Sequence, residues 1–197
     1  GTSGIHGAPL GDEEIQLARD QLCWKHEPFE IPQDIYDAWS CVDAGNKKQQ
    51  VWQQQYAAYK TAHPQLAKEL ERRCNAELPE NWAADTEKAL QAINDKAESV
   101  ATRKASELAL EEVGPLLPEL NGGSADLTGS NNTWWSGSKG VLADDVSGNY
   151  IYYGVREFGM SAMMNGMALH GGFIPYSGTF LTFSDYARNA VRMAALM

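Results

Sequence analysis

The sequence has 197 residues, 43% of them hydrophobic and six of them tryptophan, which is enough apolar material for a medium-sized core. A net charge of −10 argues against nucleic acid or an anionic membrane surface as a partner, and no apolar run reaches the roughly 18 residues of a membrane span. The three cysteines are odd in number and lack metal-ligand spacing, which indicates reduced thiols and a cytoplasmic protein.

The first half of the chain is predicted to be helical. A glycine-rich loop over residues 1–11 leads into a helix that Asp12 is expected to cap. Further helices are then expected over residues 34–44, 47–62 and 64–74. Their Gln- and Lys-rich faces indicate solvated packing elements.

The second half has a different pattern. Residues 75–82, which include Pro79, are the best candidate for a domain boundary. Beyond them short apolar segments alternate with helical patterns, which predicts an α/β fold with a parallel sheet flanked by helices. Strands are expected over residues 120–123, 151–155 and 173–176. Helices are expected over residues 85–95, around 101–109, and from a capping Ser184 to the end of the chain.

The stretch YIYYGVREFGMSAMMNGMALHG, residues 150–171, is the most informative. A strand-like run is followed at once by Arg156 and Glu157 and then by apolar residues at helical spacing. Glu157 is therefore expected between a buried strand and a helix, at the edge where ligands bind in open parallel sheets. A carboxylate there is costly to bury without a partner. The alternative is an Arg156–Glu157 ion pair that ties down a loop.

Other candidate side chains follow the expected strands, while no nucleophile elbow, Walker loop, dinucleotide fingerprint or zinc pattern is present in the sequence. The candidates are Asp126, Ser130, Arg156, Glu157, Phe180, Phe183 and Tyr186. Structural alternatives are Asp126 as a loop cap, the aromatics as core, and His6 and Arg103 as exposed loop and helix residues. Together, aromatic faces beside a lone carboxylate suit a flat heterocycle whose ring nitrogen needs a hydrogen bond.

Seven motifs in one order resemble the transketolase family and cover nearly the whole chain. They are HGAPLG, ATRKAS, GPLLPEL with GGSADL, GSN with WSGSK, GNYI with YGVREFGM, LHGGF with PY and TF, and YARNAVRMAALM. The resemblance implies that residues 1–74 are the C-terminal part of the diphosphate-binding domain and a helical connector. It also implies that residues 75–82 are a linker and that residues 83–197 are a pyrimidine-binding domain, truncated at its C-terminal side.

The resemblance implies an enzyme that uses thiamine diphosphate to move a two-carbon ketol unit from a ketose phosphate to an aldose phosphate, in the pentose phosphate pathway. It implies a cytoplasmic homodimer whose sites each join the first domain of one subunit to the middle domain of the other. Alternatives are another thiamine-diphosphate enzyme, such as a deoxyxylulose-phosphate synthase, and a non-catalytic transketolase-like dimerising chain.

Parts of the family pattern are missing from the sequence. In the family, Mg²⁺ or Ca²⁺ is held by a GDG…N segment that has no counterpart here, so no residue of this chain is expected to bind the metal. The sequence begins GTSGIHG without Met and stops at Met197 within a predicted helix. We therefore expect a fragment of a longer protein, inactive when isolated.

Two residues carry over from the family as catalytic. Glu157, in GVREFGM, resembles the glutamate that hydrogen-bonds the aminopyrimidine ring and favours its imino tautomer. A dry pocket would keep a proton on this carboxyl whereas a helix N-terminus favours the anion, so its charge stays open. His6 resembles the histidine that touches both cofactor and substrate.

Further residues carry over as binding residues. Phe183 resembles the ring that stacks on the pyrimidine, with Phe180 and Tyr186 lining the same pocket, and the pair Asp126 and Leu127 resembles residues near the thiazolium. The sugar-phosphate end is expected to meet Arg103 and Ser130, because a guanidinium fork suits a phosphate.

Overall fold

The computed structural model describes residues 3–197. The chain forms two compact units, residues 1–58 and residues 59–197. Within the described residues, every helix is too short or too polar to cross a membrane.

The first unit is helical. It contains a 3-10 turn, η1 (Ser3–Ile5), the helices α1 (Asp12–Gln21) and α2 (Gln33–Trp39), and most of α3 (Val42–Ala62). Gly11, not Asp12, holds the capping position of α1, so Asp12 is a first-turn acid that favours the positive end of the helix dipole. The helix expected over 34–44 ends at Trp39 because Ser40 is extended, and α3 begins already at Val42.

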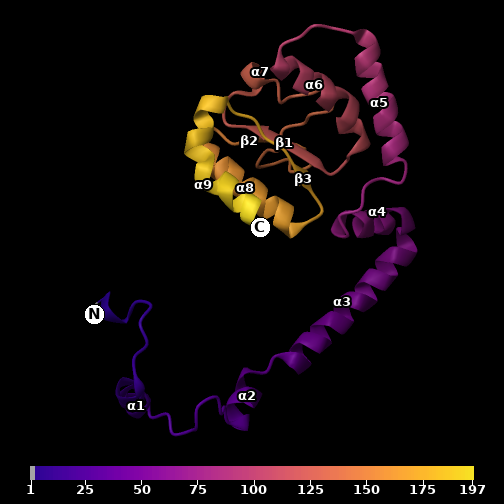
Figure 1. Cartoon of the computed structure of the whole chain (residues 1–197). Helices are drawn as coiled ribbons and strands as arrows, with labels where there is room; N and C mark the ends of the chain where they lie inside the picture. Colours follow the sequence, from indigo (N-terminus) through magenta and orange to yellow (C-terminus); the bar gives the residue numbers. More distant parts are fainter. Residues whose placement is uncertain (1–2) are drawn as a thin grey trace. The chain divides into compact units, whose positions relative to one another are not determined.

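The second unit is an α/β structure, as predicted. Its elements are α4 (Pro64–Cys74), α5 (Trp82–Lys96), α6 (Thr102–Val113), η2 (Gly114–Leu116), β1 (Leu120–Ser124), α7 (Thr128–Asn131), β2 (Tyr150–Tyr152), α8 (Glu157–His170), β3 (Ile174–Pro175), η3 (Leu181–Phe183) and α9 (Ser184–Leu196). Figure 1 shows α8 and α9 on one side of the small sheet and α5 and α6 on the other.

The three strands are parallel in the order β2-β1-β3, with β1 in the centre. Gly122 is opposite Tyr150 on one side of β1, and Leu120 is opposite Ile174 on the other. A further parallel bridge joins Ser124 to Gly178 beyond the end of β3. All five residues of β1 are buried, which places the core of this unit around the central strand.

Several bounds differ from the sequence prediction. The strand expected over 151–155 ends at Tyr152, because Gly154 takes a φ of +68 and turns the chain toward α8. The third strand is shortened to Ile174–Pro175, and α5 begins at Trp82. Ser184 is not the cap of α9 but its first residue, and its hydroxyl donates to the Leu181 carbonyl at 2.6 Å.

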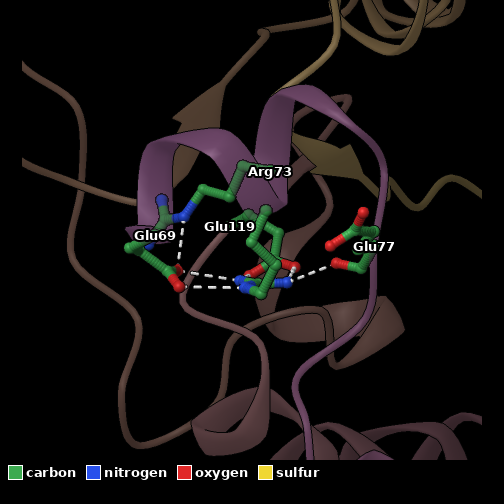
Figure 2. A network of polar contacts seen from close by, with 5 residues as sticks. Glu69, Arg73, Glu77 and Glu119 are labelled. Carbon is green, nitrogen blue, oxygen red and sulfur yellow. Dashed lines mark hydrogen bonds and ion pairs between the residues drawn. The ribbon is translucent and has the colours of Figure 1, made fainter. Parts of the chain in front are cut away.

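A buried network of charges fastens α4 to the start of β1 (Figure 2). The Arg72 guanidinium donates to both carboxylate oxygens of Glu119, at 2.9 and 2.8 Å, and the Arg72 and Glu119 side chains are only 12% and 4% exposed. Glu69 accepts from Arg72 and from Arg73, and the Glu77 carbonyl accepts from Arg72 at 2.6 Å. Because all three guanidinium nitrogens of Arg72 meet acceptors, the network holds α4 against the sheet.

The network also alters the acidity of its carboxyls. The hydrogen bond from Arg72 lowers the pKa of Glu69 to about 2. Burial opposes the same effect at Glu119, but the bidentate contact with Arg72 still lowers the pKa of that carboxyl. Both side chains are therefore held as anions at neutral pH.

Candidate functional site

The candidate site is built around two pockets of the second unit. The carboxylate pocket, about 820 Å³, is lined by Ala125, Asp126, Leu127, Val155, Arg156, Glu157, Phe158, Gly159, Phe183 and Tyr186. The arginine pocket, about 860 Å³, takes its polar lining from Thr102, Arg103, Ser106, Ser130, Asn131, Thr133, Tyr176, Ser177 and Thr179, and Phe180 also lines it. Residues that follow all three strands line these pockets, as expected for the carboxyl edge of a parallel sheet.

Glu157 is the first residue of α8 and only 7% exposed. The Thr179 hydroxyl donates to its Oε1 at 3.2 Å. Within residues 3–197, no ion pair joins Glu157 to Arg156, whose guanidinium donates instead to the Tyr153 carbonyl at 2.9 Å. The interpretation of Arg156 and Glu157 as a loop-tying ion pair is therefore wrong.

Aromatic rings form one wall of the carboxylate pocket. Phe183 and Tyr186 both line it, with ring centroids 6.2 Å apart. Phe180 stacks on Phe183 at 6.1 Å with an interplanar angle of 18°, but it lines the arginine pocket. The structure therefore brings two of the three predicted aromatics beside Glu157 and puts the third in the other pocket.

Asp126 and Leu127 lie on the loop after β1, in the carboxylate pocket. Asp126 has a φ of +64, and its side chain has no hydrogen-bond partner among residues 3–197. The loop is held by Ser124, whose Oγ accepts from the Leu127 N–H at 3.0 Å. Ser124, and not Asp126, caps this loop, which leaves the Asp126 carboxylate available to a ligand.

Arg103 and Ser130 come together in the arginine pocket, although they are 27 residues apart. Arg103, from the first turn of α6, donates to the Ser130 carbonyl of α7 at 3.1 Å. This contact uses one guanidinium N–H, so the remaining donors suit a phosphate.

Two residues that hold the site were not singled out in the sequence. Ser124 is 1% exposed; its hydroxyl donates to the Gly178 carbonyl and accepts from the Asn131 side chain, both at 3.2 Å. Thr179, beside Gly178, reaches Glu157. The only signal for their roles in the sequence is that both lie within the family motifs, Ser124 in GGSADL and Thr179 in the TF pair.

His6 belongs to the first unit. It follows η1 and is exposed, and its backbone N–H donates to the Ser3 carbonyl at 3.0 Å. Its catalytic role stays a prediction. Among the residues that the structure describes, no three or more His, Cys, Asp or Glu side chains are grouped so that they could hold a metal ion.

Comparisons with known proteins give a consistent result. Residues 98–197 match the family model of the transketolase pyrimidine binding domain, and residues 1–79 match that of the transketolase thiamine diphosphate binding domain. Transketolase 2 of Vibrio vulnificus and transketolase 1 of Vibrio cholerae are 56% and 57% identical to this chain over all 197 residues. The chain spans about 30% of the length of these curated relatives.

Solved structures agree. A transketolase from Pichia stipitis in complex with sedoheptulose-7-phosphate superposes with a TM-score of 0.81 at 41% identity, covering 98% of this chain and 29% of that one. Transketolase from Leishmania mexicana gives a TM-score of 0.81 at 34% identity, covering 96% of this chain and 28% of that one. These likenesses extend to the arrangement of the sheet and its helices.

Proposed function

Because this chain belongs to the transketolase family, we propose that it supplies the pyrimidine side of an active site that transfers a two-carbon ketol unit from a ketose phosphate to an aldose phosphate. The observation that carries the proposal is the buried Glu157 carboxylate, bonded by Thr179 through Oε1 only, in a pocket walled by Phe183 and Tyr186.

The residues of the carboxylate pocket fit the pyrimidine half of thiamine diphosphate. The Phe183 ring offers a flat apolar surface for stacking, and Glu157 offers a carboxylate oxygen for a ring nitrogen. When bound, the cofactor supplies the electron sink that stabilises the two-carbon unit during transfer. The role of Glu157 is to hold or release a proton at its Oε2 atom.

The arginine pocket would take the phosphorylated end of the substrate. Arg103 has unused guanidinium donors, and Ser130 adds a hydroxyl nearby. One solved relative holds a sugar phosphate, sedoheptulose-7-phosphate, which supports this assignment for the same class of ligand.

We also propose a homodimer in which a second copy covers apolar surface on α8 and α9. Met163 and Leu169 of α8, and Val191 and Leu196 of α9, are all more than half exposed, which is unusual for such an apolar helix pair. In that dimer His6 and Glu157 of one chain would serve opposite sites. Mg²⁺ or Ca²⁺ would be held with the diphosphate by residues outside this sequence, and the three free cysteines suit a cytoplasmic location.

The test replaces Glu157 with Ala in a full-length transketolase that carries these 197 residues. We expect kcat to fall by about 10²–10⁴-fold, because acid–base groups contribute on this scale. The matched control is Glu98→Gln, at an exposed position, which should leave kcat unchanged. If Glu157→Ala turns over at a near-normal rate at saturating cofactor, Glu157 has no catalytic role, and the carboxylate pocket serves a non-catalytic function.

The isolated 197-residue chain gives a second test. Without the metal ligands the pocket offers ring stacking and the carboxylates of Glu157 and Asp126, which cannot hold a strongly hydrated diphosphate. Calorimetric titration with thiamine diphosphate and Mg²⁺ should therefore give no micromolar binding. Such binding would mean that the chain holds a complete site.

A further inference from the structure

The two oxygens of the Glu157 carboxylate have different surroundings. Oε1 accepts a hydrogen bond from the Thr179 hydroxyl at 3.2 Å. Oε2 has no hydrogen-bond partner among residues 3–197, and this oxygen is not fully enclosed by the described protein atoms. One oxygen is therefore held, and the other is open to whatever enters the carboxylate pocket.

Thr179 is itself held in place by the sheet. Its neighbour Gly178 forms the parallel bridge to Ser124, and the Gly178 N–H donates to the Gly123 carbonyl at 3.1 Å. The Gly178 carbonyl accepts from the Ala125 N–H at 3.2 Å. A Cβ on Gly178 would lie 2.4 Å from the Thr133 methyl, so the backbone can pass here only as glycine.

The next residue along the chain is fixed as well, because the Phe180 ring stacks on Phe183. The Thr179 hydroxyl therefore projects from a segment anchored on one side to β1 and on the other to the aromatic wall. A donor held in this way restricts rotation of the carboxylate that it bonds. Because the hydroxyl is neutral, it orients the carboxylate without pairing its charge.

We propose that Thr179 is a positioning residue: by holding Oε1, it presents Oε2 of Glu157 to the pyrimidine ring. The inference rests on the proposed function, since it gives Thr179 a role only if Glu157 meets that ring. It predicts that the hydroxyl of residue 179, and not its methyl group, determines how well Glu157 works.

The test compares variants of residue 179 in the full-length transketolase that carries these residues. Thr179→Val keeps the shape and removes the hydroxyl, and Thr179→Ser keeps the hydroxyl. For Val we expect thiamine diphosphate, titrated calorimetrically with Mg²⁺, to bind about tenfold more weakly, because the Glu157 carboxylate is no longer held in the orientation that meets the ring. We expect kcat to fall by a similar factor. Thr179 also lines the arginine pocket, but because its hydroxyl is bonded to Glu157, KM for both sugar phosphates should stay within about twofold. Thr179→Ser should restore both values.

Two further variants control for shape and folding. In α5, the Thr86 hydroxyl donates to the Trp82 carbonyl at 2.6 Å, so Thr86→Val removes a hydroxyl outside both pockets and should change neither value. Thr179→Ala and Thr179→Ser differ only in the hydroxyl. This pair repeats the comparison if the melting temperature of Thr179→Val falls.

The proposal is overturned if Val and Ala both bind cofactor and turn over within about twofold of the parent, or if Ser is impaired as much as Val. Glu157→Gln separates the two levels of inference. If it binds cofactor normally and is fully active, the proposed function fails. If it is impaired while Thr179→Val is normal, only the role of Thr179 fails.

Discussion

Two buried carboxylates at opposite ends of the same sheet have contrasting partners. Glu119, just before β1, has both oxygens on the Arg72 guanidinium, in a network that Glu69 and the Glu77 carbonyl complete. Glu157, at the start of α8, is nearly as buried but receives one hydrogen bond from a neutral hydroxyl. A fully paired carboxylate stabilises the fold, whereas a partly paired one keeps an oxygen for a ligand.

The arginines repeat the contrast. Arg72 donates hydrogen bonds to Glu69, to Glu119 and to the Glu77 carbonyl. Among the described residues, Arg103 donates to one carbonyl, that of Ser130. Perturbing the Arg72 network should therefore alter stability, and perturbing Arg103 or Glu157 should alter ligand binding.

The largest expected effect is from Arg72→Met. Removing the cation leaves Glu119 buried without its partner, so the free energy of unfolding should fall by about 3–5 kcal/mol. Urea denaturation of the chain measures this. The control is Lys68→Met, which breaks the exposed contact of Lys68 with Glu80 at 3.6 Å and should cost less than about 1 kcal/mol. Equal losses in the two variants would contradict the structural role of the network.

A direct comparison of the two carboxylates comes next. Glu119→Gln keeps the shape but replaces charge-assisted bonds, so it should cost about 2 kcal/mol of unfolding free energy. Glu157→Gln should cost less than about 1 kcal/mol without cofactor, because the Gln amide oxygen can still accept the hydrogen bond from the neutral Thr179 hydroxyl. The same urea experiment measures both, and a larger cost at Glu157 would reverse the comparison.

Arg103→Ala should leave stability nearly unchanged and lower kcat/KM for phosphorylated ketoses by about tenfold, the value of a charge-assisted bond. An unphosphorylated ketose should be less affected, and parallel assays in the full-length enzyme provide the comparison. The same loss for both substrates would show that Arg103 acts by supporting the Ser130 loop.

The smallest effect is that of acid on the network. The folded pKa of Glu69 is about 2, below the ordinary value of 4.5, so the contribution of Glu69 to stability is complete above about pH 4.5 and is lost as the pH falls toward 2. Glu69 is 36% exposed, so solvent screens much of this contribution. Acid denaturation curves of the parent and Glu69→Gln should converge at the low end of this window and separate above it; curves that stay parallel would contradict the linkage.

Local rules predicted much of the fold. The bounds of α4 agree with the prediction because Pro64 begins it, and β1 was placed because glycine-rich residues follow a short apolar run. The end of β2 was missed because Gly154 turns the chain two residues after Tyr152. The alternative of an Arg156–Glu157 ion pair was wrong because neighbouring residues at the start of a helix point in different directions.

The sequence predicted which residues form the candidate site better than it predicted the hydrogen bonds that hold them in place. Glu157, Phe183 and Asp126 line one pocket, and Arg103 meets Ser130. The roles of Ser124 and Thr179 depend on bonds to residues 54 and 22 positions away, which are set by the register of β1 against the chain after β3. In a glycine-rich strand such as β1, the side-chain pattern specifies the register only weakly.

The central position of β1 also affects how the protein is made. Ser124 and its partner Gly178 are separated by 54 residues, and β2 and β3 both follow β1 in the chain. A ribosome adding about 5–20 residues per second therefore leaves at least one edge of β1 unpaired for several seconds before its last partner emerges. Closing such long loops is slow, so this strand is where we expect chaperone binding and misassembly to compete with folding.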